Sequence, residues 1–141
     1  MTRDSDAVRT MCAQHDELRG LVARYRLELA KPAPDLAALS DCRWRLLRLV
    51  MTHLAYEEAH LFPALARRGS ALDAAGRALK SEVSALFGQF QDHVREWTAL
   101  RIEADWRGFC RHATMLLDVL GTRMAREELE LYTPLLVAKA A

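Results

Sequence analysis

Apolar side chains recur at alternating intervals of three and four residues in four segments of the chain. This spacing is typical of helices that bury one face. A pair of prolines before Asp35 ends the first segment, and Pro63 ends or kinks the second, because proline has no backbone N–H to donate. The third segment carries its apolar pattern as far as Leu100, and Asp105 is the expected N-cap of the fourth. Short connections between such helices favour an all-α, antiparallel up-down four-helix bundle, which we expect to fill residues 1–141 as one domain.

The chain also contains an internal repeat. Residues 52–62 (THLAYEEAHLF) align without gaps on residues 122–132 (TRMAREELELY), at an offset of 122 − 52 = 70. His15 in the first segment corresponds to His93 in the third at an offset of 93 − 15 = 78, which is eight residues more. We therefore expect two similar helical hairpins that face each other around a pseudo-two-fold axis.

Charge and composition exclude several classes of partner. The 20 basic and 19 acidic side chains leave a net charge of +1, which gives no electrostatic reason to expect nucleic acid or an anionic membrane. The N-terminal residues MTRDSDAVRT lack the apolar core of a signal peptide, so we expect a cytoplasmic protein. The three cysteines are far apart, without a C-x-x-C pair, which argues against a disulfide framework and a thiolate zinc site.

Histidines and glutamates interrupt the apolar faces, and burying such groups without partners is costly. His53 and Glu57 are four residues apart, so they point in nearly the same direction from one helix and both can reach one ion. The equivalent pair in the repeat is Arg123 and Glu127. Imidazole nitrogens suit iron, zinc, copper and nickel, and a carboxylate can bridge two ions. We predict a metal site inside the bundle with five ligands, namely His15, His53, Glu57, His93 and Glu127.

These residues give the chain a resemblance to the hemerythrin-like, or HHE cation-binding, family. The resemblance covers nearly the whole sequence through four motifs: His-Asp-Glu-Leu from His15, His-x-x-x-Glu-Glu with Leu-Phe-Pro from His53, the single His93, and Glu-Glu with an aromatic residue and Pro from Glu127. It implies a four-helix bundle that holds two non-haem irons bridged by carboxylates and solvent. It also implies use of that centre for oxygen binding or for iron or redox sensing.

Two departures from the family pattern concern the second ion. Arg123 stands where the family has its fourth-helix histidine, and a guanidinium has no lone pair for a metal. Trp97 stands where oxygen-carrying members have a second third-helix histidine. If the Arg123 side chain points into the bundle, it can form an ion pair with Glu57 or Glu127. Its positive charge would then take the place of the second ion. The sequence therefore leaves two irons, one iron and a metal-free bundle open.

The expected function is metal-dependent binding or sensing of oxygen, another small diatomic, peroxide or iron itself. The alternatives are an oxidoreductase that acts on peroxide or oxygen, and a metal-free structural or interaction module. His112 lies 123 − 112 = 11 residues before Arg123, about 16 Å along a helix, so it is expected to be a hydrogen-bonded core residue. For His60, a ligand and a solvated group are both open, and the sequence does not indicate an oligomeric state.

Overall fold

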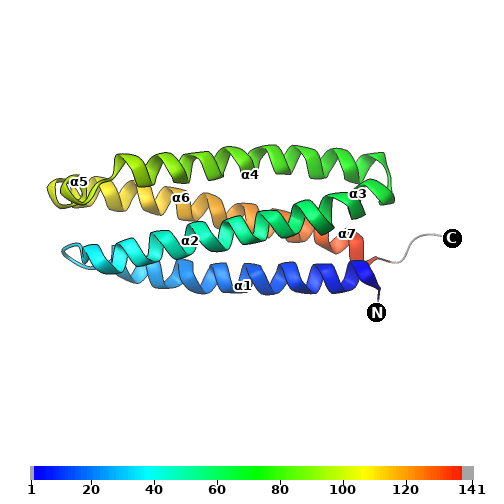
Figure 1. Cartoon of the computed structure of the whole chain (residues 1–141), viewed down its shortest axis with the longest axis horizontal. Helices are drawn as coiled ribbons and strands as arrows, with labels where there is room; N and C mark the ends of the chain where they lie inside the picture. Colours follow the sequence, from blue (N-terminus) through cyan, green and yellow to red (C-terminus); the bar gives the residue numbers. More distant parts are fainter. Residues whose placement is uncertain (1, 138–141) are drawn as a thin grey trace.

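The computed structural model describes residues 2–137, so residue 1 and residues 138–141 of the predicted domain lie outside the described part. It confirms the predicted all-α bundle: four rods, each a long helix with any short elements that continue it, lie side by side (Figure 1). The described residues begin and end at the same end of the bundle, which carries α3 and α7. The long helices are α1 (Arg3–Leu29), α2 (Leu36–Tyr56), α4 (Ser70–Glu96) and α6 (Trp106–Glu127). The shorter elements are the π-helical turns η1 (Glu57–Leu61) and η2 (Glu128–Tyr132), with α3 (Phe62–Arg68), α5 (Ala99–Ala104) and α7 (Thr133–Leu136).

The helix starts follow the local sequence. Asp35 caps α2 by accepting from Ala38 N at 3.1 Å. Asp105, the predicted N-cap, caps α6 by accepting from Gly108 N at 2.9 Å. Gly69 has a φ of 128°, a conformation open to glycine, and it reverses the chain between α3 and α4. The chain turns again at the opposite end of the bundle through α5, so α4 ends at Glu96 and not at Leu100.

Two rods contain a π-helical turn, and the two turns differ by one residue from the offset of the repeat, since 128 − 57 = 71. The N–H of Phe62 bonds to Glu57 O and the N–H of Thr133 bonds to Glu128 O, each five residues back along the chain. A proline follows directly in both cases, at positions 63 and 134. Proline clashes with the carbonyl four residues back in a regular α-helix, so a wider turn at this point accommodates its ring. The second rod therefore continues beyond Pro63 into α3 instead of ending there.

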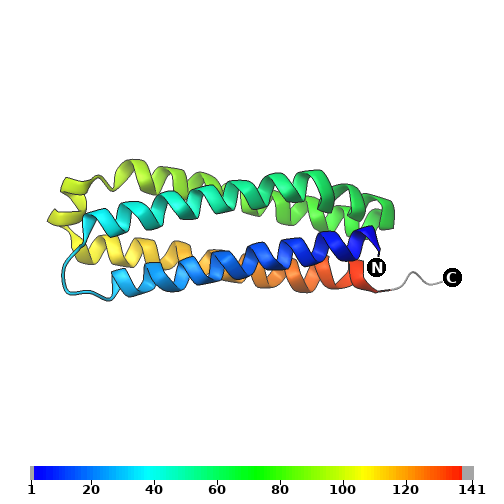
Figure 2. The same ribbon diagram turned by 60° about the horizontal axis from the view of Figure 1, so that its bottom comes forward.

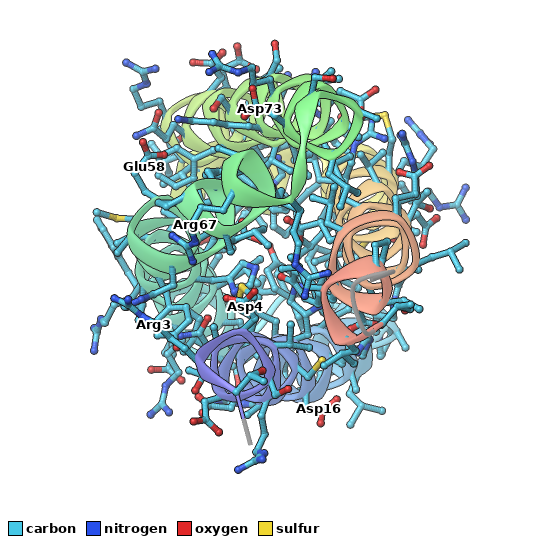
Figure 3. The ribbon with its side chains drawn as sticks, turned by 90° about the vertical axis from the view of Figure 1, so that its right-hand side faces the viewer. Arg3, Asp4, Asp16, Glu58, Arg67 and Asp73 are labelled. Carbon is cyan, nitrogen blue, oxygen red and sulfur yellow. The ribbon has the colours of Figure 1, made fainter. Side chains whose placement is uncertain are left out.

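The buried apolar residues form two clusters along the bundle. One cluster lies at the end with the termini, where α1 runs beside α7 (Figure 2), and the other fills the remaining length. On α1, Met11 belongs to the first cluster and Leu18 to the second, and the same change of cluster occurs on α4 between Leu79 and Leu86. A polar layer separates the two clusters. Within residues 2–137, no helix is long and apolar enough to cross a membrane.

Candidate metal centre

Two buried imidazoles face each other in the polar layer. Nε2 of His15 on α1 lies 3.0 Å from Nε2 of His53 on α2, and both side chains are almost fully buried. Oε1 of Glu127, at the end of α6, lies 3.1 Å from His15 Nε2 and 3.6 Å from His53 Nε2. Donor atoms of these three residues lie within 4.8 Å of one another, so they can surround a single ion.

Glu57 joins this group from η1. Its Oε2 atom lies 3.3 Å from His53 Nε2 and accepts a hydrogen bond from the Tyr132 hydroxyl at 2.8 Å. The side chain of Glu57 is 1% exposed. Four of the five predicted ligands, from three of the four rods, are therefore brought together.

The other nitrogen of each imidazole is held from outside the cluster. Nδ1 of His15 lies 2.7 Å from Glu128 Oε2, and Nδ1 of His53 lies 2.7 Å from Gln14 Oε1. A carboxylate and an amide oxygen only accept hydrogen bonds, so each Nδ1 carries a proton and donates it. Arg19 donates to the second oxygen of Glu128 at 2.8 Å and so fixes that carboxylate. Each Nε2 is left to face the centre, which is the arrangement found around metal-binding histidines.

The electrostatics of the cluster favour positive charge. Burial alone would lower the pKa of His53, but its hydrogen bonds to Glu127 and Glu57 raise that pKa to about 9. Burial would raise the pKa of Glu127, yet its contacts with His15 and His53 lower it to about 2. Burial, together with Glu127, raises the pKa of Glu57 to about 7. Glu57 and Glu127 therefore keep the His53 imidazole protonated at neutral pH. A metal ion bound at Nε2 of His53 would take the place of that proton.

Comparison with protein-family models adds an independent observation. The model of the hemerythrin HHE cation binding domain matches residues 6–135. The chain belongs to this family. No curated protein and no solved structure matched the chain. The two imidazoles and two carboxylates are a donor set that iron and other transition metals accept, so the residues present fit the cation that the hemerythrin HHE family is named for.

His93, the fifth predicted ligand of the hemerythrin-like site, does not lie in this cluster. Its Nδ1 lies 2.8 Å from His112 Nδ1, and its ring stacks on Phe109 at 5.2 Å between centroids. The indole of Trp97 donates to the same His112 nitrogen at 3.1 Å, so His93 must donate there too. His112 is thus a hydrogen-bonded residue, as predicted. His112 precedes Glu127 by 127 − 112 = 15 residues, about 22 Å along the same rod, so His93, which contacts His112, lies outside the cluster.

The displacement of His93 follows from the unequal offsets of the repeat. An offset of 70 maps His15 onto position 85 of α4, whereas His93 is eight residues, or about 12 Å, further along. The part of α4 that lies between the two apolar clusters carries Glu82, which reaches the fourth rod through Arg123 and Arg126. This hemerythrin-like chain therefore has no third-helix histidine at the level of the cluster.

Arg123 does not contact the carboxylates of the cluster, a pairing that the sequence had left open. Its Nη1 lies 3.3 Å from Glu82 Oε2, and its Nε is a buried atom without a hydrogen-bond partner in the described structure. The ion pair with Glu57 or Glu127 that the sequence suggested is replaced by this pair with α4. His60 is exposed, and its ring packs on Tyr56 at 4.3 Å between centroids.

Sequence reasoning did not assign roles to three residues that touch the cluster: Gln14, Glu128 and Tyr132. The sequence marks Glu128 only as the second residue of the Glu-Glu motif, and the half-buried Gln14 has no pattern that marks it. Tyr132 is five residues after Glu127 and would point about 140° away from it in a regular α-helix. The π turn η2 brings the fifth residue back over the first. The available signal was Pro134, because a wider turn at this point accommodates its ring.

Proposed function

We propose that this protein binds one iron ion through His15, His53, Glu57 and Glu127, and that the ion binds or senses oxygen or peroxide. The observation that carries the proposal is the pair of inward Nε2 atoms, 3.0 Å apart, whose imidazoles are fixed by hydrogen bonds at Nδ1. Groups that only needed to fill a core would not require both nitrogens of two rings to be oriented in this way.

The donor types favour iron. Two imidazoles and a carboxylate with open coordination positions are typical of non-haem ferrous sites that react with oxygen. The donor atoms of His15, His53 and Glu127 fit one ion, because all of them lie within 4.8 Å of one another. A second ion would lack imidazole ligands, since His93 contacts His112 and the fourth rod carries Arg123 in place of histidine.

The chain's own residues supply the rest of the function. Glu128 and Gln14 orient the imidazoles, and Glu57 accepts a hydrogen bond from the Tyr132 hydroxyl. The apolar clusters on both sides exclude bulk water from the centre, so only a small ligand can reach it. Bound iron would supply an open coordination position and one-electron redox chemistry for that ligand.

A metal-free structural role has less support. That alternative required Arg123 to neutralise the buried carboxylates, but its guanidinium contacts Glu82 on α4. Glu57 and Glu127 are instead contacted by imidazoles and a phenol, which leaves the cluster attractive to a cation.

The test is the absorption spectrum of protein loaded with ferrous iron without oxygen and then mixed with oxygen or peroxide. We expect a spectral change proportional to the bound iron, and no change for the variant His53→Ala. Absence of iron from the wild type would refute the metal site, and bound iron that is inert to both reagents would refute the sensing role. Consumption of peroxide well beyond the amount of iron would indicate an oxidoreductase instead.

A further inference from the structure

The hydroxyl of Tyr132 lies among the donor atoms of the candidate centre. It is 2.8 Å from Glu57 Oε2 and 3.3 Å from the Nε2 atoms of both His15 and His53. The side chain is 1% exposed, so water does not compete for this oxygen. A phenol that only satisfied a hydrogen bond would need one acceptor, whereas this oxygen is placed close to three groups that can bind one ion.

The repeat shows that this oxygen is particular to the second hairpin. Tyr132 aligns with Phe62 at the offset of 132 − 62 = 70, and both follow a glutamate by five residues across a π turn. Phe62 has no hydroxyl and packs with apolar residues of the cluster near the termini. In the same hairpin, Arg123 replaces the imidazole of His53. The second hairpin therefore lacks the imidazole and has a phenol oxygen instead. That oxygen lies beside the Nε2 atoms of His15 and His53.

We propose that Tyr132 coordinates ferric iron as a phenolate, together with His15, His53 and Glu127. This inference rests on the iron site proposed above. As the iron–oxygen bond forms, the phenol O–H bond breaks and the oxygen keeps the electron pair. The proton passes to Glu57 Oε2, which already accepts it, and leaves to solvent as that carboxylate also approaches the ion. No oxidant is needed, because the iron enters in the ferric state.

Anionic phenolate is a ligand that iron accepts in other proteins, and a bound cation strongly favours the deprotonated form of a ligand. With Glu127, it gives the ion two anionic oxygens besides two neutral nitrogens. This set favours the ferric over the ferrous state.

The test is the visible absorption of the full chain loaded with ferric iron, with elemental analysis of the same samples. We expect a broad phenolate-to-iron charge-transfer band in the wild type, and tyrosine ring vibrations in resonance Raman spectra excited within it. Tyr132→Phe preserves the ring that packs in the core and is expected to keep the iron while the band is lost. The chain has two other tyrosines, so Tyr25→Phe and Tyr56→Phe are matched controls that should keep both iron and band.

The possible failures are separable. Wild-type protein that holds iron but shows no band, or a band that persists in Tyr132→Phe, overturns the role of Tyr132 and leaves the iron site standing. Wild-type protein that binds no iron overturns both proposals. The Raman measurement on the wild type does not depend on the folding of any variant, so absence of phenolate vibrations from an iron-loaded sample is decisive by itself.

Discussion

Nδ1 of His15 donates to Oε2 of Glu128 across 2.7 Å, which ties the first helix of the bundle to the last rod. Glu58 occupies the equivalent position of the repeat, at 128 − 58 = 70 residues earlier, but it is exposed and forms an ion pair with Lys80 at 2.7 Å. Two equivalent glutamates of the repeat thus have different roles: Glu128 accepts a hydrogen bond from a buried histidine, whereas Glu58 forms an ion pair at the surface. The pseudo-symmetry of the sequence does not extend to the centre.

Glu128→Gln is expected to lower the affinity for ferrous iron by at least about tenfold, because it removes the carboxylate charge that makes the His15 imidazole a stronger ligand, and changes to such outer partners typically cost about 10–100-fold. Helix content should stay unchanged, since Glu128 is only half-buried. Glu58→Gln is the matched control and should bind iron like the wild type. Competition titrations with a chelator measure both affinities, and equal losses in the two variants would contradict the role of Glu128.

His93→Leu is expected to keep the iron stoichiometry of the wild type. The His93 side chain is bonded to His112, far along the bundle from Glu127, so its removal leaves the cluster of donor atoms intact. His15→Leu is the comparison, because it removes one of the two inward Nε2 atoms and should lose most of the metal. Loss of iron from His93→Leu, in protein that keeps its helical circular dichroism, would refute the placement of His93 outside the site.

Arg123→His is expected to leave the iron content near one ion per chain. The substitution restores an imidazole to the fourth rod, but α4 offers Glu82 and no histidine at this level. A single added ligand is too little to hold a second transition-metal ion against water. Elemental analysis measures the outcome, and a rise toward two irons with oxo-bridge absorption would contradict the single-ion site.

Iron affinity is expected to rise with pH up to about 9 and then to level off. His53 keeps its proton below its pKa of about 9, and the metal must displace that proton to reach Nε2. Glu57, with its pKa raised to about 7, adds a second proton to be displaced in more acidic solution, so the dependence steepens there. Glu127 stays ionised throughout, because its pKa is about 2. Anaerobic titrations at a series of pH values measure the slope, and an affinity independent of pH would refute this competition.

The fold was predictable because its signals are local. The spacing of apolar residues identifies the helices, and the side chains of Asp35 and Asp105 mark where two of them start. The third helix was extended too far, to Leu100, because an apolar spacing that continues across Thr98 does not reveal a helix end. Thr98 instead caps the short helix α5, and Leu100 is 81% exposed.

The centre was predictable only within one helix. Glu57 follows His53 by four residues, and its N–H bonds to His53 O as in an α-helix, so their shared direction follows from the geometry of the helix itself. The relation of His93 to His15 depends on how far one rod is shifted along another, which the lengths of the connections determine and the apolar pattern does not. Tyr132 depends on a change of hydrogen bonding in η2, for which the only local sign is the following proline.

The iron content of the purified full chain, after loading and removal of unbound metal, tests the central claim most directly. We predict close to one iron per wild-type chain and close to none in His53→Ala, with unchanged helical circular dichroism in both. Wild-type protein with two irons per chain, or with none, would contradict a single ion held between His15, His53, Glu57 and Glu127.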